Sequence, residues 1–458
     1  MKIVKENEKF LDNIKRIHMI GIGGSGMCPL AEILHSKGYI ITGSDNNEGD
    51  PLKRIQKLGI KTFMGHSESN IEGAELVVYS AAISKDNPEL IAAKNKDIPV
   101  MERSELFGAI TRKFDKVIGV CGTHGKTTAT SMLAQILIMN DFDPTAVIGG
   151  MLPLIGANGR AGNSEYMVCE ACEYVDTFLH LSPDISVLLN IDNDHLEYFK
   201  TMENLTASFR KFISMSKTAF INGDDELCKK AAEGLDIETI TFGINDSNTY
   251  YARNIHPGKR GMIFTAYKSG EPLCEIEMSI PGEHNIYNAL AAFSVAHSFG
   301  ICSDSIKDAI EKFTGAARRF EFICTKHDVV FADDYAHHPT EIKATLTAAK
   351  SLNYNRVIAV FQPFTFSRTA MLKDEFIEAL NIADKVILTP IMGSRETNTY
   401  GICSEDLAKD IRNCVCVLDF SGAIAEIRES AKPGDLVITM GGGDIYKVSH
   451  AIRDNDEY

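Results

Sequence analysis

The sequence predicts an α/β protein of three domains whose sheets are mainly parallel. Short apolar runs alternate with helical stretches in three successive parts of the chain, which is typical of parallel sheets covered by helices. Two glycine-rich turns each stand between an apolar run and a helical stretch, as in nucleotide-binding α/β domains. The length of 458 residues also suits about three domains, at roughly 150 residues each.

The first domain is expected over residues 1–113. Its predicted strands are four short apolar runs at residues 16–22, 39–42, 61–64 and 76–79. The helical stretches between them predict a parallel sheet.

A glycine-rich turn follows the first of these strands. It matches the pattern G-x-G-x-x-G and contains Gly21, Gly23, Gly24, Ser25 and Gly26. The bare N–H groups of such a turn can approach a diphosphate at a helix N-terminus. Asp45 ends the second strand, where a carboxylate could bind a ribose hydroxyl. The pattern therefore predicts a dinucleotide or nucleoside diphosphate site, and the alternative is a tight turn without a ligand.

A second glycine-rich turn belongs to the second domain, which is expected over residues 114–316. The domain's predicted elements are strands at 116–121, 165–169, 185–189 and 218–222 and a helix at 126–139. The turn consists of Gly122, Thr123, His124, Gly125, Lys126, Thr127 and Thr128. Its amides can cradle phosphates, Lys126 can reach the β- and γ-phosphate oxygens, and the Thr127 hydroxyl can hold Mg²⁺. The upstream glycine spacing differs from G-x-x-x-x-G-K-[ST], but this chemistry is kept.

Acidic and histidine side chains follow two later strands of the second domain. Glu173 lies just beyond the strand at 165–169, and His195 lies just beyond the strand at 185–189. Because the carboxyl ends of parallel strands share one edge of a sheet, both are candidate metal ligands beside the phosphates. The alternative is an N-cap or a solvated acidic loop.

The third domain is expected over residues 317–458, with strands at 356–361, 385–389, 415–418 and 435–440. Upstream, Asn285 and Asn288 carry amides that can pair with an adenine edge. Arg318 and Arg319 suit a transferring γ-phosphate, because the planar fork of an arginine binds oxyanions. The segment from Asp333 to Pro339 predicts either a second metal site or a loop that caps the following helix.

Charge and composition exclude several classes of protein. Lys and Arg total 47 against 62 Asp and Glu, so the net charge is −15 and bulk electrostatic binding to nucleic acid is not expected. The charged segment 1–7 and the lack of a long apolar span predict a cytoplasmic protein without membrane attachment. The eleven cysteines predict reduced thiols. A zinc site is disfavoured because its candidate ligands fall in different domains, namely Cys169, Cys172, Cys414 and Cys416.

Two anion-binding turns in separate domains imply two nucleotide-like ligands. They predict ATP together with a second nucleotide-like substrate, in a reaction powered by phosphoryl transfer. Two alternatives stay open on the residues alone. One is an NAD-dependent oxidoreductase with a regulatory nucleotide site, and the other is a non-catalytic ATP-dependent binding protein.

Over nearly its full length the chain resembles the Mur ligases of bacterial peptidoglycan synthesis. The matching motifs are the two glycine-rich turns, Asn285 with Asn288, Arg318 to Phe320, Asp333 to Pro339 and Thr439 to Asp444. His124 in the second turn, together with the first turn, favours the alanine-adding member. The resemblance implies Rossmann-like first and third domains around a P-loop ATPase domain with a parallel sheet. It also implies an ATP-dependent ligase that joins L-alanine to the lactyl carboxylate of UDP-N-acetylmuramate through an acyl phosphate.

The resemblance also implies roles for individual residues. The first turn would hold UDP and not NAD, together with Asp45, Ser80 and Arg368. The second turn would hold ATP, with the remaining contacts made by His284, Asn285 and Asn288 around the adenine, Arg319 at the γ-phosphate and Asp334 at the ribose. The ligands of Mg²⁺ or Mn²⁺ would be Thr127, Glu173 and His195. The catalytic residues would be Lys126, Arg319 and His338, with His338 the candidate base, in a monomer or weak homodimer.

Two departures from the family pattern concern selectivity and the metal ligands. The chain has Phe364 where relatives commonly have a histidine, and Cys172 and Tyr174 where many have Asp and Ser. A ligase that prefers glycine or serine, or that attaches a tripeptide, therefore stays open.

Overall fold

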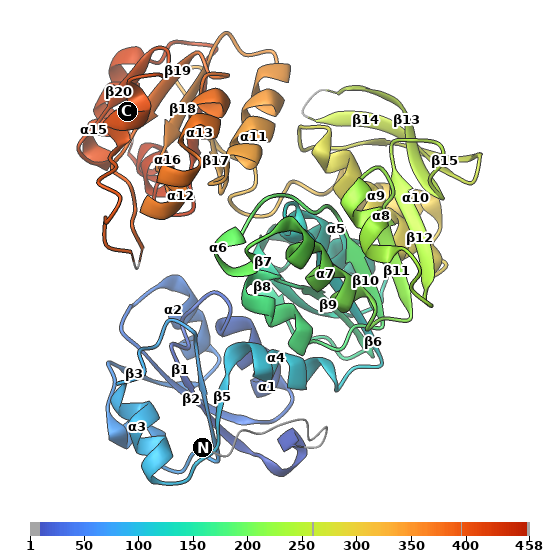
Figure 1. The fold of residues 1–458 in the computed structure, drawn as a ribbon, viewed down its shortest axis with the longest axis vertical. Helices are drawn as coiled ribbons and strands as arrows, with labels where there is room; N and C mark the ends of the chain where they lie inside the picture. The colour runs from blue at the N-terminus through green and yellow to red at the C-terminus, as the bar shows by residue number, and fades with distance from the viewer. Residues whose placement is uncertain (1–9, 259–260, 395, 456–458) are drawn as a thin grey trace. The chain divides into compact units, whose positions relative to one another are not determined.

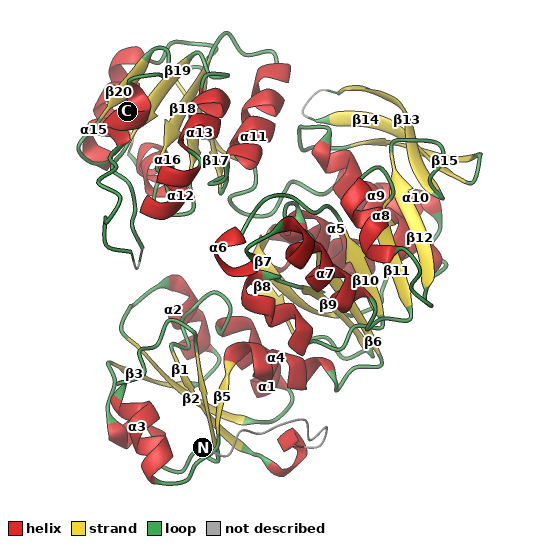
Figure 2. Cartoon of the chain, in the orientation of Figure 1, coloured by secondary structure: helices red, strands yellow, loops and turns green. Residues whose placement is uncertain are grey.

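Three separate β-sheets organise the computed structural model, which describes residues 10–258, 261–394 and 396–455 (Figure 1). The sheets have five, ten and six strands, and helices and loops surround each one (Figure 2). The strands fall within residues 16–102, 116–277 and 321–440, which confirms the three-domain α/β fold class. The segment 1–7, on which the expectation about secretion rests, lies outside the described residues. Among the residues that are described, no helix is both long enough and apolar enough to span a bilayer.

The internal contacts of the chain group it into two compact units. The first unit contains Met1–Ala252, Ala266–Cys274 and Tyr287–Ala309. The second contains Arg253–Thr265, Glu275–Ile286 and Ile310–Tyr458. The predicted limits 1–113, 114–316 and 317–458 stay a prediction.

The first sheet is parallel, with the strand order β3-β2-β1-β4-β5. Its order reverses between β1 and β4, where ligands of open α/β sheets bind. The predicted strand at 16–22 ends at Ile20, because Gly21 has a φ of +77° and starts the turn. The elements of this part are η1 (Phe10–Asn13), β1 (Arg16–Ile20), α1 (Cys28–Ser36), β2 (Ile40–Asp45), α2 (Asp50–Lys57), β3 (Lys61–Met64), η2 (Glu68–Ile71), β4 (Leu76–Tyr79), α3 (Pro88–Asn95), β5 (Val100–Glu102) and α4 (Arg103–Thr111).

The second sheet has the order β15-β14-β13-β12-β11-β10-β6-β9-β7-β8. Its centre is parallel as predicted, but β7 pairs antiparallel with β8. Only a short connection joins these two strands, so they can pair only as a hairpin. The strands are β6 (Lys116–Cys121), β7 (Thr145–Leu152), β8 (Ala157–Arg160), β9 (Tyr166–Glu170), β10 (Ile185–Leu188), β11 (Thr218–Asn222), β12 (Glu238–Gly243), β13 (Tyr250–Pro257), β14 (Met262–Lys268) and β15 (Glu271–Glu277).

Helices accompany this sheet along the chain. They are α5 (Lys126–Met139), η3 (Pro153–Ile155), η4 (Tyr174–His180), α6 (Leu196–Phe199), α7 (Met202–Ile213), α8 (Glu226–Ala232), α9 (His284–Ser298) and α10 (Ser303–Glu311). The predicted helix at 126–139 is confirmed as α5. In the core, the ring of Phe212 on α7 stacks on Phe178 at 4.6 Å between centroids. A Cβ at Gly119 of β6 would lie 2.9 Å from the Phe212 ring, so the glycine makes room for this aromatic layer.

The third sheet has the order β16-β17-β21-β18-β19-β20. It is parallel except for β16 and β17, which form a hairpin across His327 and Asp328. Both turn residues have positive φ, as a type I′ turn requires, but neither is the asparagine or glycine that would mark it in a sequence. The elements are β16 (Glu321–Lys326), β17 (Val329–Asp334), α11 (Pro339–Ser351), β18 (Val357–Phe361), α12 (Phe366–Met371), α13 (Lys373–Leu380), β19 (Lys385–Leu388), α14 (Ser404–Ala408), β20 (Cys414–Cys416), α15 (Phe420–Ser430), β21 (Leu436–Met440) and α16 (Tyr446–Asp454).

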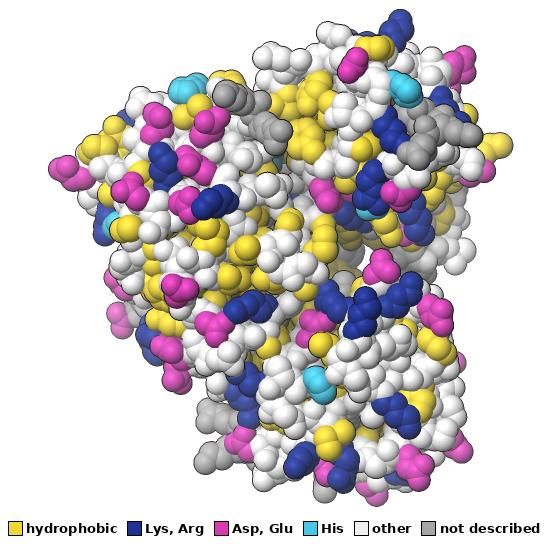
Figure 3. Space-filling model, turned by 180° about the vertical axis from the view of Figure 1, so that it is seen from behind, with side chains coloured by type: hydrophobic (Ala, Val, Ile, Leu, Met, Phe, Trp, Pro, Cys, Tyr) yellow, Lys and Arg dark blue, Asp and Glu magenta, His cyan; other side chains and the backbone are white. Residues whose placement is uncertain are grey.

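Charged side chains of both signs are interspersed over the face seen in Figure 3. Several Lys and Arg side chains lie near one another on this face, with Asp and Glu among them, and the chain as a whole has a net charge of −15.

Helix α4 packs against η4 at a close approach that only glycine permits. A Cβ at Gly108 would lie 2.1 Å from the carbonyl oxygen of His180. We therefore expect Gly108→Ala to lower the free energy of unfolding by about 1–3 kcal/mol, because the methyl group overpacks the contact. Urea unfolding followed by circular dichroism measures this change.

The matched control is Ala109→Ser, at the neighbouring half-buried position of the same helix. It should change the free energy of unfolding by about 0.5 kcal/mol or less. Equal stability of the two variants would contradict the role assigned to Gly108.

Candidate active site

The second glycine-rich turn joins β6 to α5 and requires its glycines. Gly122 has a φ of +138°, and Gly125, at the N-cap of α5, has a φ of +84°. A Cβ at Gly125 would lie 2.4 Å from the side-chain oxygen of Asn288. The turn thus places bare backbone at the positive end of a helix dipole, where anions bind.

Lys126 is held inside this turn by three oxygen acceptors. Its ammonium donates to the carbonyl oxygens of Gly122 at 2.6 Å and Thr123 at 2.9 Å, and to Glu173 Oε1 at 3.0 Å. Burial alone would lower the pKa of Lys126, but the nearby Glu173 carboxylate outweighs it and raises the pKa. The lysine therefore carries its positive charge at neutral pH beside the bare backbone of the turn.

Glu170 is a site residue that the sequence analysis missed. It ends β9, and its Oε2 accepts a hydrogen bond from the Thr127 hydroxyl at 2.9 Å and another from the Gly149 N–H at 2.7 Å. The available signal was its position at the end of a strand parallel to β6. Only the register, which pairs Val120 with Glu170, brings the carboxylate to the threonine.

The oxygen donors around Thr127 suit a hard divalent cation. Thr127, Glu170 and Glu173 supply the hydroxyl and carboxylate ligands that Mg²⁺ prefers. The ring of His195, another predicted ligand, lies 4.7 Å from the ring of Tyr174, between centroids, and its Nε2 lies 3.6 Å from Asp194 Oδ2. Within residues 10–258, 261–394 and 396–455, no three His, Cys, Asp or Glu side chains form a ready metal cluster. The predicted ligand set of Thr127, Glu173 and His195 therefore stays a prediction.

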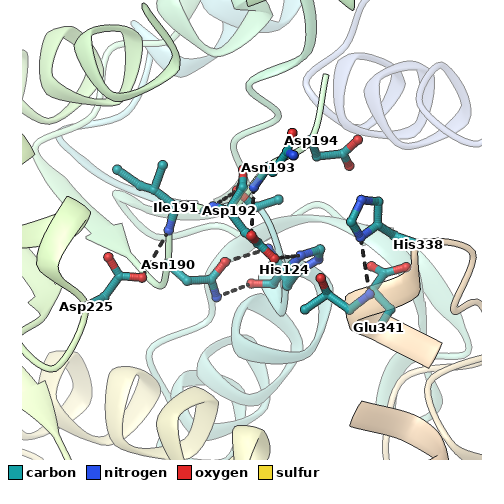
Figure 4. A network of polar contacts seen from close by, with 12 residues as sticks. His124, Asn190, Ile191, Asp192, Asn193, Asp194, Asp225, His338 and Glu341 are labelled. Atoms are coloured by element: carbon teal, nitrogen blue, oxygen red, sulfur yellow. Dashed lines mark hydrogen bonds and ion pairs between the residues drawn. The ribbon is translucent and has the colours of Figure 1, made fainter. Parts of the chain in front are cut away.

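The loop after β10 is hydrogen-bonded to the second glycine-rich turn (Figure 4). The amide of Asn190 accepts from the His124 N–H at 2.8 Å and donates to the His124 carbonyl at 3.0 Å. Asp192 lies 3.1 Å from the His124 ring nitrogen, and its own N–H donates to the Thr123 hydroxyl at 2.9 Å. Asp225 accepts from the Ile191 N–H at 3.3 Å. The turn is thus held in shape by contacts at Thr123 and His124.

The residues predicted around the adenine fall in both compact units. Asn288 lies beside Gly125 in the first unit. Asn285 and His284 belong to the second unit, where the Asn285 amide donates to the Pro281 carbonyl at 2.7 Å. Their contact with adenine stays a prediction.

The predicted residues of the third sheet are ordered by local contacts. Asp334 accepts from the N–H groups of Phe320 at 2.8 Å and Ala336 at 2.7 Å, and burial raises its pKa to about 6. The His338 side chain accepts from the Thr340 N–H at 3.4 Å and is the N-cap of α11, which confirms the capping alternative for this segment. Arg319 lies 3.9 Å from Glu341. The predicted catalytic role of His338 is a separate matter and stays a prediction.

Arg368 and Phe364 also lie in the second unit. The Arg368 guanidinium donates to the Phe364 carbonyl at 3.4 Å. The Phe364 ring lies edge-on to His337 at 6.1 Å between centroids, and a Cβ at Gly442 would lie 3.3 Å from each ring. Phe364 therefore covers bare backbone at the end of β21. The predicted contact of Arg368 with UDP stays a prediction.

The first glycine-rich turn is bonded to the end of β2. Gly21 N–H and Ile22 N–H donate to the Ser44 carbonyl at 2.8 and 3.1 Å, and Gly23 N–H donates to Asp45 Oδ2 at 2.9 Å. The other Asp45 oxygen accepts from the Asn47 N–H. In this structure Asp45 therefore shapes the turn itself, and its predicted contact with a ribose stays a prediction. Ser80 lies across from Gly21, with its Cβ 3.5 Å from the position of an added Gly21 Cβ.

A cavity of 880 Å³ lies in the first unit beside this turn. Three basic side chains contribute to its wall, namely Lys85, Lys94 and Arg103. A Cβ at Gly26 would lie 3.3 Å from the Arg103 guanidinium, so this cation adjoins the turn. No sequence pattern marked Arg103, because only the fold brings the start of α4 to the turn.

The described cysteines are free thiols, as expected. Cys169 is buried, and burial raises its pKa to about 12.

Three family models match successive parts of the chain. The model described as Mur ligase family, catalytic domain, matches residues 16–115. The Mur ligase middle domain matches residues 120–296, and the Mur ligase, glutamate ligase domain, matches residues 318–443.

Curated relatives match along almost the whole chain. A UDP-N-acetylmuramate--L-alanine ligase from Acetivibrio thermocellus is 44% identical over 446 residues, which cover 95% of each chain. One of the same name from Caldanaerobacter subterraneus is 42% identical and covers 98% of this chain and 99% of the relative.

Solved structures share the fold. The UDP-N-acetylmuramate-alanine ligase of Thermotoga maritima superimposes with a TM-score of 0.83 at 28% identity, over 96% of this chain and 98% of that one. A murein peptide ligase from Psychrobacter arcticus has a TM-score of 0.74 at 23% identity, over 96% and 98% of the two chains, and shows the fold alone.

The two-way hydrogen bonding of Asn190 to His124 predicts a defect in nucleotide binding. We expect Asn190→Ala to weaken binding of a non-hydrolysable ATP analogue about tenfold, because the phosphate-binding turn loses both bonds. Titration calorimetry measures the dissociation constant. The control is Asn193→Ala, in the exposed part of the same loop, which should bind within twofold of the parent chain. Unchanged affinity in a folded Asn190→Ala protein would contradict this assignment.

Proposed function

The chain belongs to the Mur ligase family, and we propose that it joins L-alanine to the lactyl carboxylate of UDP-N-acetylmuramate at the expense of ATP. The observation that carries the proposal is its similarity, over 95% of both chains, to a ligase named for these substrates. Lys126, inside a glycine turn at the start of α5, supplies the cationic phosphate site that such a reaction needs. The product enters peptidoglycan synthesis.

The first step activates the acid, because a carboxylate is a poor electrophile towards an amine. The lactyl carboxylate oxygen attacks the γ-phosphorus of ATP, the bond from that phosphorus to the β–γ bridging oxygen breaks, and an acyl phosphate and ADP form. Lys126 and the amides of the turn stabilise the charge on the phosphate oxygens. Arg319 is a further candidate for this role, because the planar fork of an arginine binds oxyanions.

The second step forms the amide. The neutral amine of L-alanine attacks the acyl carbon, a tetrahedral intermediate forms, and phosphate leaves with the electron pair of the broken C–O bond. A base must take one proton from the amine. His338 is the candidate base, and its imidazole lies at the start of α11, the helix whose Glu341 is 3.9 Å from Arg319.

A divalent cation, Mg²⁺ or Mn²⁺, would neutralise phosphate charge when bound, and Thr127, Glu170 and Glu173 are suited to hold it, with His195 as a further candidate. The Thr127 hydroxyl is already oriented by Glu170, and Glu173 also balances the charge of Lys126. These residues therefore order the phosphate end of the site around Lys126.

The remaining substrate sites follow from the first unit. The turn from Gly21 to Gly26 holds the diphosphate of UDP, with Ser80 and Arg103 beside it. An oxidoreductase using NAD at this turn is disfavoured, since the curated relatives are named as ligases over the same residues. The proposal places the enzyme in the cytoplasm, where its substrates are made, as a monomer or weak homodimer.

Replacing the phosphate-binding lysine tests the mechanism. We expect Lys126→Ala to lower kcat at least about a hundredfold, because the cation that stabilises the transferring phosphate is lost. Binding of UDP-N-acetylmuramate should stay within twofold. Phosphate release measures turnover, and calorimetry measures binding.

The control for this variant is Lys116→Ala, at the exposed start of β6, which should keep full activity. Turnover of Lys126→Ala within tenfold of the parent chain would show that the turn does not act on the transferred phosphate.

The identity of the amino acid is tested by a panel. Phosphate release in the presence of UDP-N-acetylmuramate and ATP is measured with L-alanine, glycine, L-serine and a tripeptide. We expect the highest kcat/KM with L-alanine. A higher value with the tripeptide would replace the proposed amino acid and leave the acyl-phosphate chemistry in place.

A further inference from the structure

A fully buried carboxylate lies in the first domain, outside the phosphate site. Glu89, in the first turn of α3, is 0% exposed. Its Oε2 accepts from the Ser44 hydroxyl at 2.6 Å, and its Oε1 accepts from the Asn70 amide at 2.5 Å. The ring nitrogens of His66 and His18 lie 3.2 and 3.7 Å from Oε2. Side chains from β1, β2, η2, α3 and the segment after β3 therefore meet at one carboxylate.

Glu89 is ionised at neutral pH in spite of its burial. Burial raises its pKa, but the His18 ring 3.7 Å away and the hydrogen bonds from Ser44 and Asn70 outweigh it, and the pKa falls to about 2. Filling this space with apolar side chains would cost less free energy than burying a charge together with several partners. The network thus calls for a role other than filling space.

Ser44 connects this network to the first glycine-rich turn. Its hydroxyl donates to Glu89, while its carbonyl accepts from the N–H groups of Gly21 and Ile22. The next residue, Asp45, accepts from the Gly23 N–H. Three successive amides of the turn are therefore anchored on two residues of β2, and Glu89 fixes the side chain of the first of them.

We propose that Glu89 is a positioning residue for the nucleoside diphosphate of the UDP-sugar substrate, acting through Ser44 on the turn from Gly21 to Gly26. It touches no substrate atom. It keeps the end of β2 in place so that the turn is ordered before the diphosphate arrives, and binding then has no ordering cost. The inference rests on the proposed function, because it needs UDP at this turn.

Two variants and one control test the inference. Glu89→Gln removes the charge, and Ser44→Ala removes the hydroxyl while keeping the carbonyl that binds the turn. We expect each to raise the KM for UDP-N-acetylmuramate and the dissociation constant of UDP about tenfold. The KM for ATP and kcat at saturating substrate should stay within twofold, a split that a general loss of stability would not produce. The control, Glu72→Gln, changes an exposed carboxylate of the same domain and should change none of these constants.

The possible outcomes are distinct. Unchanged UDP affinity in both folded variants overturns the inference, and so does an equal loss of UDP affinity, ATP affinity and kcat. If Glu89→Gln does not fold, Ser44→Ala alone decides in the same terms. If the parent chain binds ATP but neither UDP nor UDP-N-acetylmuramate, the proposed function fails together with the inference. If the parent chain binds ATP and UDP-N-acetylmuramate, and the folded variants bind both with the same affinity as the parent chain, the inference fails and the proposed function stands.

Discussion

The parallel pairing of β6 with β9 on one side and β10 on the other is the constraint on which the phosphate site depends. The register sets Val120 opposite Glu170 and Cys121 opposite Leu188, so the three strands end at one edge. Whatever follows each strand must then meet the others. The glycine turn after β6 is consequently flanked by carboxylates from one neighbour and by Asn190 from the other.

The charged side chains at this edge of the second sheet must balance one another. The Lys126 side chain is 13% exposed, and the Glu173 carboxylate at 3.0 Å compensates its charge. Removing one partner of such a pair leaves an uncompensated charge. The resulting loss of folding free energy exceeds what the pair itself contributes to stability. The first domain solves a related problem with Glu89, whose charge is stabilised by polar hydrogens. Each of the two domains thus holds a glycine turn in place through a buried carboxylate. Glu173 contacts Lys126 of the second turn directly, and Glu89 acts on the first turn through Ser44 of β2.

Much of the fold could be predicted because hydrophobic periodicity is a local property. The predicted strands 61–64, 76–79, 116–121 and 218–222 have the limits that the structure shows. The strands that were not predicted are β5, β7, β8 and β12 to β17, and some of these carry no local mark. The hairpin of β16 and β17 turns on His327 and Asp328, which lack the usual turn signal, and β5 is only three residues long. The antiparallel pairing of β8 follows from its short connection to β7, and the pattern of apolar residues does not predict it.

The sequence by itself determined which chemistry the chain carries, since Gly122 to Thr128 and the turn at Gly21 can be recognised from neighbouring residues alone. The resemblance to Mur ligases rested on such motifs, and the family models confirm it. Only the tertiary structure decided that Glu170 orients Thr127, that Arg103 lies against the first turn and that Glu89 reaches Ser44. These pairs are separated by tens of residues along the chain, and hydrogen bonds depend on distances of about 3 Å that only the packed sheets determine.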